Sequence, residues 1–222
     1  MQEFWRGAGR ALGVVVGFLP IGMSLGAIAI QTKLSSAVTI FMSMWLYAGA
    51  SQFALVEAAK QQLPWLSILI TVLIINLRHI AMSLSAQSVY GHFPRWQRWV
   101  LAAGLIDETF ALEMTEEARS FPYYLGMHVC CWLSWVGATA IGCQLGLLLP
   151  ERWLQFALPA LFLCLLLANV RRQGRGIWAV VAIALALVLM LQSFGSTGIL
   201  LAILGVAIAA SVLLRPQAST QP

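Results

Sequence analysis

Apolar runs about as long as the hydrocarbon core of a bilayer constrain the fold of this chain more than any other feature. Hydrophobic residues make up 60% of the 222 residues and charged residues 9%, whereas about a quarter of a soluble domain is charged. The runs are continuous, which argues against the alternating strands of a barrel. We predict an all-α polytopic membrane protein of about eight transmembrane helices. The candidate spans lie near residues 12–31, 37–59, 65–88, 99–116, 123–149, 153–170, 177–194 and 197–214.

Cationic residues in the short loops predict the orientation of the chain. The formal net charge is +5, and its position in loops fits the positive-inside rule better than nucleic-acid binding. With the N-terminus in the cytoplasm, eight cations fall inside: Arg6, Arg10, Lys60, Arg119, Arg171, Arg172, Arg175 and Arg215. Four fall outside: Lys33, Arg95, Arg98 and Arg152. We therefore expect a multi-pass protein with both termini cytoplasmic.

Weak internal similarity predicts two related halves. Gly17–Pro20 aligns with Gly104–Asp107, and Asn76 aligns with Asn169, at offsets that grow from 87 to 93 residues. Each copy holds three spans, so the second copy enters the bilayer from the opposite side and gives a 3+3 inverted repeat with discontinuous helices. The predicted divisions are a first repeat at 1–90, a second at 91–175, two C-terminal spans at 176–214 and a disordered tail at 215–222.

The first span contains a proline and several glycines in mid-membrane. Pro20 removes a backbone donor, so we expect a kink or break there, with the following N–H groups free to bind an anion such as a carboxylate. Gly22 and Gly26 also form a spacing typical of close helix packing, and the two interpretations are compatible. Together with polar residues of the next two spans, this predicts a substrate-binding set: Pro20, Gly22, Ser24, Gly49, Ser51, Gln52 and Asn76.

Two adjacent carboxylates, Asp107 and Glu108, interrupt the apolar run between Trp99 and Met114. Charges at bilayer depth are costly and usually face a bundle interior or a wet cavity, although a surface amphipathic helix is the alternative. Burial would favour the neutral acid and a role in carrying protons, whereas pairing with Arg78 would keep the acid ionised. Both possibilities stay open, so Asp107, Glu108 and Arg78 are the proton-coupling candidates. Arg78 is either a functional residue or a helix-end anchor.

Enzymatic chemistry has little support in the sequence. No HExxH, GxSxG or Walker motif occurs, and His79 and His128 are interpreted as packing or gating residues. The four cysteines show no CxxC spacing and are expected to be small buried side chains, so we predict no cofactor and no metal. The remaining functional alternatives are a secondary transporter, a passive channel and a structural subunit of another transporter.

The residues described above resemble the AzlC family of YgaZ-like large subunits. The resemblance rests on Pro20-x-Gly22, Gly49-Ala-Ser51-Gln52, Asn76-x-Arg78-His79 and Asp107-Glu108, and it extends to about Arg172. It implies export of branched-chain or other apolar amino acids, valine-like and including methionine, across a bacterial inner membrane by alternating access driven by protons. It also implies a small hydrophobic partner subunit of the AzlD or YgaH type.

Overall fold

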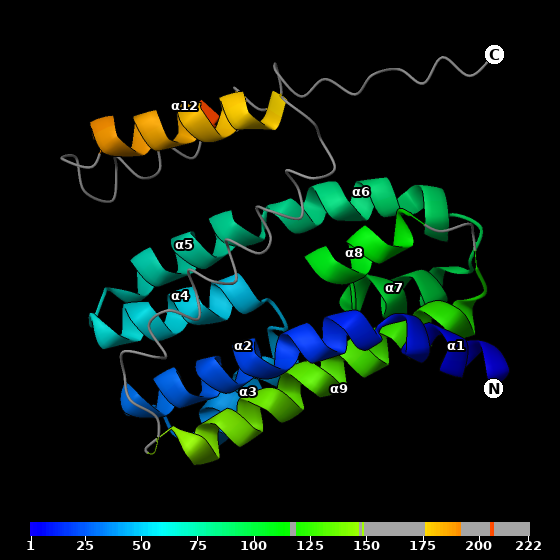
Figure 1. Ribbon diagram of the computed structural model, residues 1–222, viewed down its shortest axis with the longest axis horizontal. Coiled ribbons are helices and arrows are strands. Elements are labelled where there is room, and N and C mark those ends of the chain that lie inside the picture. The colour runs from blue at the N-terminus through cyan, green and yellow to red at the C-terminus, as the bar shows by residue number, and fades with distance from the viewer. Residues whose placement is uncertain (116–118, 147, 149–175, 192–204, 207–222) are drawn as a thin grey trace. The chain divides into compact units, whose positions relative to one another are not determined.

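The computed structural model describes residues 1–115, 119–146, 148, 176–191 and 205–206, and every regular element in these residues is a helix (Figure 1). The chain divides into two compact units at Pro159. The helices of the first unit are α1 (Gln2–Arg10), α2 (Leu12–Gln31), α3 (Ser36–Trp45), α4 (Gly49–Lys60), α5 (Trp65–Asn76), α6 (Arg78–Tyr90), α7 (Arg95–Ala103), α8 (Asp107–Glu113) and α9 (Phe121–Leu145).

Three described segments are long and apolar enough to cross a membrane: Leu12–Gln31, Trp65–Tyr90 and Phe121–Leu145. They match three of the predicted spans. The second unit contributes α12 (Gly176–Leu191), a 16-residue apolar helix at the position of the predicted span 177–194. The predicted span 153–170 lies outside the described residues, and so does all of 197–214 except residues 205–206.

Helices α2 and α9 pack against each other and run parallel. The Ser134 hydroxyl donates to the Val15 carbonyl over 3.0 Å, and the Gln31 amide donates to the Gly146 carbonyl over 2.9 Å. Contacts therefore advance along both helices in the same direction. Since parallel helices enter a bilayer from the same side, α2 and α9 both begin at the end of the molecule where α1 lies (Figure 1).

Glycines allow the backbones of these two helices to approach closely. A methyl group on Gly26 would lie 2.2 Å from the Thr139 carbonyl oxygen, and one on Gly142 would lie 2.0 Å from the Met23 carbonyl oxygen. These separations leave no room for any side chain. The packing interpretation is thus confirmed for Gly22 and Gly26, whereas methyl groups on Gly13 and Gly17 would meet nothing within 4 Å.

The break expected at Pro20 is wrong, because α2 is a single helix from Leu12 to Gln31 with Pro20 inside it. Proline removes one backbone hydrogen bond, but the rest of the helix is held by its glycine-lined contact with α9. Pro20 itself is exposed, and the Ser24 hydroxyl donates to the Pro20 carbonyl over 2.8 Å. The discontinuities of the fold lie in the following segments instead.

Residues 37–59 form two short helices, α3 and α4, in place of one spanning helix. Their 10 and 12 residues measure about 15 and 18 Å, roughly half of the hydrocarbon thickness. Helix α3 runs antiparallel to α9, with Ser43 bonded to Thr139, and α4 leads back towards the end from which α3 came (Figure 1). We call α3–α4 the first re-entrant pair, with its tip at residues 46–48.

Residues 99–116 also belong to a pair of short helices, α7 and α8, which starts and ends at the α1 end of the molecule. Trp96 near the start of α7 packs on Phe121 at the start of α9, whereas Gly104 at its end lies against His128. Helix α8 then returns, since Glu113 bonds to Tyr90 at the far end of α6. We call α7–α8 the second re-entrant pair, with its tip at residues 104–106.

This topology differs from the alignment of the two predicted halves, which equated the continuous α2 with the interrupted α7–α8. In the described residues a span followed by a re-entrant pair occurs twice, first as α2 with α3–α4 and then as α5–α6 with α7–α8. The two segments, α2–α4 and α5–α8, start at opposite ends of the first compact unit (Figure 1). The inverted repeat of the sequence analysis therefore stays a prediction.

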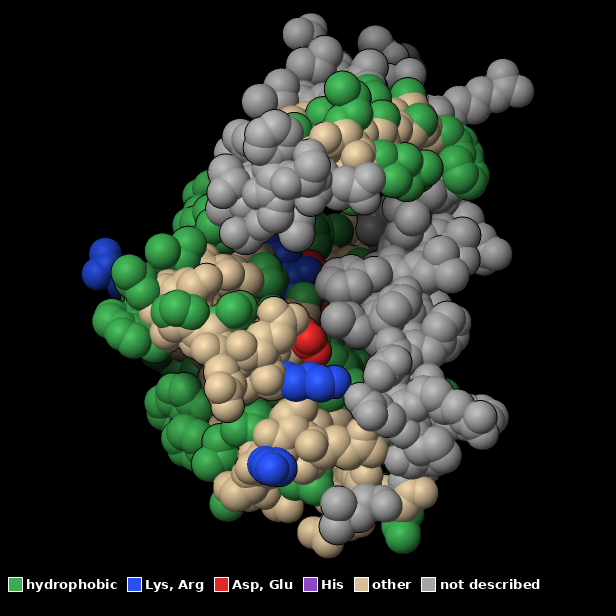
Figure 2. All heavy atoms as spheres, turned by 90° about the vertical axis from the view of Figure 1, so that its left-hand side faces the viewer, with side chains coloured by type: hydrophobic (Ala, Val, Ile, Leu, Met, Phe, Trp, Pro, Cys, Tyr) green, Lys and Arg blue, Asp and Glu red, His purple; other side chains and the backbone are tan. Residues whose placement is uncertain are grey.

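Because of the re-entrant pairs, the loop cations are divided between the two ends of the molecule differently from the sequence prediction. Residues at the α1 end now include both loops that flank the second re-entrant pair, and the loops of the first pair lie at the other end. Figure 2 views that other end, where the described residues present a hydrophobic area and few Lys and Arg side chains are visible. In the described residues, five cations outside the spans lie at the α1 end and two at the opposite end: Arg6, Arg10, Arg95, Arg98 and Arg119 against Lys33 and Lys60.

Candidate functional site

An ion pair joins the middle of one span to the tip of a re-entrant pair. The span Trp65–Tyr90 is interrupted at Leu77, between α5 and α6. Arg78 follows immediately, near the midpoint of the span, and its guanidinium pairs with the carboxylate of Asp107, the first residue of α8. The two side chains are 34% and 30% exposed. Arg78 is therefore no helix-end anchor, and it meets the predicted partner.

Four buried polar atoms on the α5–α6 interruption and on the first re-entrant pair lack a hydrogen-bond partner in the described structure. They come from the tip of the first re-entrant pair, from its helix α4 and from the α5–α6 interruption. Because buried polar groups are nearly always hydrogen-bonded, such a group of atoms indicates a place for a ligand or water. The atoms are the Tyr47 hydroxyl, the Ser51 hydroxyl, Asn76 Oδ1 and Arg78 Nε.

Tyr47 links the two tips. It is 7% exposed and has a φ of 39°, a left-handed conformation that costs a non-glycine residue on the order of 1–3 kcal/mol. Its hydroxyl is close enough to Glu108 and Cys131 for electrostatic interaction, and Glu108 is likewise close to Arg78. The tip of the first re-entrant pair thus lies beside the acidic start of α8.

Gln52 serves to hold the first re-entrant pair on α9. Its carbonyl accepts from the Trp135 indole over 2.8 Å, its amide donates to the Ser43 hydroxyl over 3.1 Å, and Ser43 donates to Thr139 over 3.1 Å. Gly49 lies against the same Trp135, whose ring a methyl group would meet at 3.0 Å. Both polar groups of the Gln52 side chain are therefore already bonded within the protein.

The predicted substrate residues of the first span lie elsewhere. Pro20 is exposed, and Gly22 faces α9, where a methyl group would lie 2.8 Å from the Ala138 side chain. Ser24 bonds within its own helix. The structure therefore brings together Arg78, Asp107 and Glu108, with Asn76 two residues before Arg78, but it does not add Pro20, Gly22 and Ser24 to them.

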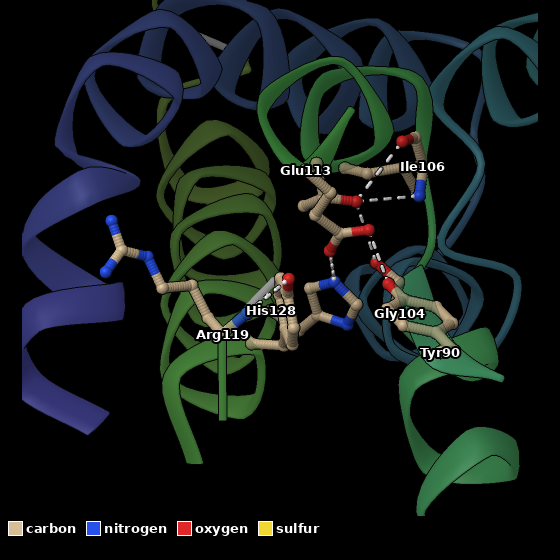
Figure 3. A network of polar contacts seen from close by, with 8 residues as sticks. Tyr90, Gly104, Ile106, Glu113, Arg119 and His128 are labelled. Atoms are coloured by element: carbon tan, nitrogen blue, oxygen red, sulfur yellow. Dashed lines mark hydrogen bonds and ion pairs between the residues drawn. The ribbon is translucent and has the colours of Figure 1, made fainter. Parts of the chain in front are cut away.

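A second polar cluster lies at the other end of α8 and was missed by sequence reasoning (Figure 3). Glu113 is fully buried; the Tyr90 hydroxyl donates to one of its oxygens, and His128 Nε2 contacts the other. The signal was present in the sequence, because Glu113 follows Asp107 by six residues in the same apolar run. His128 was treated as a packing residue, and nothing in the local pattern connected it to Glu113.

The turn before α8 is closed by Thr109. Its hydroxyl accepts from the Ile106 backbone N–H over 3.0 Å and lies 3.3 Å from the Gly104 carbonyl. This arrangement pairs the backbone N–H of Ile106, the residue that precedes the seven-residue helix α8, with a side chain of the first helical turn. Thr109 therefore holds Asp107 in position to meet Arg78.

A polar stripe on α6 leads from the α1 end towards the ion pair. His79, Ser83 and Gln87 are four residues apart and thus share one helix face. A cavity of about 350 Å³ is lined by all three, and a cavity of about 550 Å³ shares Ser83 and Gln87 and adds Arg95 and Arg98. The two cavities therefore share Ser83 and Gln87 and extend along one face of α6, from Arg95 and Arg98 to His79, the neighbour of Arg78.

Three spanning segments, two inverted re-entrant pairs and a charged pair near the midpoint of a span define a polytopic helical membrane protein with an intramembrane polar site. The sequence comparisons identify the family to which this membrane protein belongs. The chain belongs to the AzlC family, whose model, described as AzlC protein, matches residues 13–149. The matched region contains every residue of the two polar clusters.

Relatives with similar sequences are membrane proteins from bacteria and archaea. An uncharacterized membrane protein of Archaeoglobus fulgidus is 35% identical over 90% of this chain and 91% of its own length. The inner membrane protein YgaZ of Escherichia coli is 32% identical over 77% and 74%. The branched-chain amino acid transport protein AzlC of Bacillus subtilis is 22% identical over 91% and 82%. No solved structure matches the chain.

Proposed function

We propose that this chain exports branched-chain or similar apolar amino acids across a bacterial inner membrane by alternating access, as the large subunit of a two-component exporter. The observation that carries the proposal is the Arg78–Asp107 ion pair, together with the unpartnered polar atoms on the α5–α6 interruption and on the first re-entrant pair. The printed names of the relatives from Bacillus subtilis and Escherichia coli support the substrate class and the membrane.

An amino-acid zwitterion complements this ion pair. Its carboxylate would bind Arg78 and its ammonium group would bind Asp107. Each of the two protein charges would then leave its protein partner and pair with the opposite charge of the substrate. Helix α4 begins at Gly49, at the tip of the first re-entrant pair, and the positive end of its dipole adds to the attraction for the carboxylate. The hydroxyls of Tyr47 and Ser51 supply further hydrogen bonds that the protein leaves unused.

The apolar side chain of the substrate would lie among Phe110 of α8 and the apolar residues at the two tips. A site that pairs both charges but offers only apolar surface beyond them selects amino acids with aliphatic side chains. Polar side chains would lose hydration without compensation. This argument leaves valine, leucine, isoleucine and methionine as the substrates to compare.

The route on α6 fits a substrate that enters from the cytoplasm. The end of the molecule with five loop cations is the cytoplasmic end by the positive-inside rule. Arg95 and Arg98 line the cavity at that end and would attract the substrate carboxylate. Both termini would be cytoplasmic if the residues after α9 cross the membrane an odd number of times.

Proton coupling and a small partner subunit of the AzlD or YgaH type complete the proposal. Asp107 and Glu108 are the coupling residues that the sequence predicts near the ion pair, and Arg78 would keep Asp107 ionised until substrate arrives. The partner would cover apolar surface of the large subunit. Its contribution is testable by expressing the chain with and without a small candidate subunit.

The test is transport in proteoliposomes that contain the purified chain with its candidate partner. Radiolabelled valine should exchange against internal valine, and an imposed pH gradient should drive it uphill. Asp107→Asn and Arg78→Gln should both abolish exchange, whereas Glu57→Gln, which removes an exposed carboxylate on α4, should not. Absence of exchange in the unaltered protein, with each of the four amino acids, would overturn the proposal.

A passive channel or a structural subunit is the second candidate function. The polar stripe along α6 is the feature that favours a channel, because a continuous polar lining is what a pore requires. The assay above separates the two functions. Uphill movement that collapses with an uncoupler excludes a channel, and movement only down the concentration gradient excludes a coupled transporter.

A further inference from the structure

The buried cluster of Glu113, His128 and Tyr90 has no part in the substrate site proposed above. It joins three elements, α8, α9 and α6, at the end of α8 that points away from Arg78 (Figure 3). We propose that Glu113 and His128 form the proton-binding site that couples transport to the proton gradient. This inference rests on the proposed function and assigns the coupling proton to a different residue from Asp107 and Glu108.

Burial means that this pair holds a proton in common. Glu113 is fully buried and His128 is 4% exposed. A carboxylate in such a place is stabilised either by becoming neutral or by facing an imidazolium, because an unpaired buried charge is costly. Both alternatives place one proton between a Glu113 oxygen and His128 Nε2, whichever atom it is bonded to. The pair can therefore gain or lose that proton as a unit.

Among the described ion pairs Glu113 is paired with His128, and the guanidinium of Arg119, which precedes α9, lies over the Tyr123 ring. Tyr90 on α6 donates to Glu113 and packs on Tyr124 of α9. Cys131 on α9 lies within electrostatic range of both Glu113 and Glu108. These neighbours are neutral or acidic, so the proton shared with His128 is the compensating charge that the site provides.

An unpartnered atom connects this site to the tip of the second re-entrant pair. His128 Nδ1 is buried without a hydrogen-bond partner, and it faces Gly104, where a methyl group would lie only 2.4 Å away. Whenever the pair holds its shared proton, Nδ1 carries a hydrogen, because the imidazole then either accepts at Nε2 or is doubly protonated. The present arrangement offers that hydrogen no acceptor. Movement of the tip would create space for one, so the protonation of His128 and the position of the tip depend on each other.

Helix α8 connects the proton site to the substrate site. Asp107 and Glu113 are its first and last residues, separated by about 9 Å along the helix axis. Each is bonded to one end of α6, Asp107 to Arg78 and Glu113 to Tyr90. Replacing either bond by a substrate or proton contact would change how α8 sits on α6. Such reciprocal dependence is what coupling requires.

The test compares exchange with gradient-driven accumulation of valine in proteoliposomes. For one-for-one coupling, a gradient of one pH unit drives about tenfold accumulation. Glu113→Gln, which mimics the protonated acid, should retain exchange within about twofold and show no accumulation. Asp107→Asn should lose both activities, and Glu57→Gln neither. Accumulation that survives in Glu113→Gln, or loss of its exchange in a folded protein, would overturn the inference.

A second measurement does not depend on the substrate. The infrared difference spectrum of the unaltered protein between acidic and alkaline pH should contain a protonated-carboxyl band that is absent in Glu113→Gln and present in Glu57→Gln. Tyr90→Phe keeps the ring but removes the donor to the carboxylate, so the frequency of this band should shift because one hydrogen bond to the carboxyl group is lost. A spectrum unchanged by both substitutions would contradict a proton site at Glu113, even if valine proved the wrong substrate.

Discussion

The close approach of Gly104 to His128 yields a quantitative prediction about the second re-entrant pair. Gly104→Ala would place a methyl group 2.4 Å from His128 Nδ1 and 2.7 Å from Cγ, about 1 Å closer than ordinary contact between heavy atoms. The imidazole cannot simply rotate away, because its other nitrogen contacts Glu113. The substitution must therefore shift either the tip or the ring.

Overpacking of this size costs about 2 kcal/mol, which corresponds to a fall of about 4–8 °C in Tm for a chain of this length. His128→Ala leaves Glu113 buried without its partner and should cost about 3–5 kcal/mol. Once the ring is gone, the methyl group has space. The double variant should then be no less stable than His128→Ala alone, so the two effects are strongly non-additive.

The assay is thermal unfolding of the purified protein in detergent, followed by tryptophan fluorescence. Gly137→Ala is the matched control, since it lies on α9 and a methyl group there meets nothing within 4 Å; it should be neutral or slightly stabilising. Additive effects of Gly104→Ala and His128→Ala would refute the contact. Equal behaviour of Gly104→Ala and Gly137→Ala would refute it as well.

The other predictions concern α2 and the ion pair. Pro20→Ala should leave valine exchange within about twofold of the unaltered protein, because Pro20 is exposed and outside the polar site. A tenfold loss of exchange would show that Pro20 belongs to the substrate site. Gly142→Val should prevent stable folding or lower Tm by about 5 °C or more, whereas Gly13→Ala, which meets nothing, should not. Asp107→Asn and Arg78→Gln should each weaken valine binding about 30-fold in a direct titration, because each removes a half-buried ionic contact worth about 2 kcal/mol. Unchanged affinity in both variants would show that the substrate binds at another site.

Apolar run length predicted the helical class and three of the spans, but it could not distinguish a crossing helix from a re-entrant pair. The run 37–59 is long enough to cross, and only the turn at Tyr47, held by a left-handed φ and by Trp135, makes it return. The run 99–116 returns because Thr109 closes a turn over Gly104. These are local hydrogen bonds and tertiary contacts, which hydropathy does not record.

The candidate site was predictable where charge at bilayer depth was the signal. Arg78 and Asp107 were candidates because a charged side chain in an apolar run carries a high free-energy cost in a bilayer. The structure pairs these two residues. Pro20 was misleading, since a proline is tolerated in a helix that a neighbour supports over its whole length. Glu113 was missed because its partners, Tyr90 and His128, are distant in sequence and are individually ordinary residues at the edges of spans.

The account depends most directly on the two re-entrant pairs, which labelling of single cysteines in intact spheroplasts would test. With the native cysteines replaced, Ser35→Cys and Gln61→Cys flank the first pair, and His92→Cys and Thr115→Cys flank the second. A membrane-impermeant maleimide should label both members of the first set from outside and neither member of the second. Labelling of only one member in either set would show that the segment crosses the membrane, and would contradict the account.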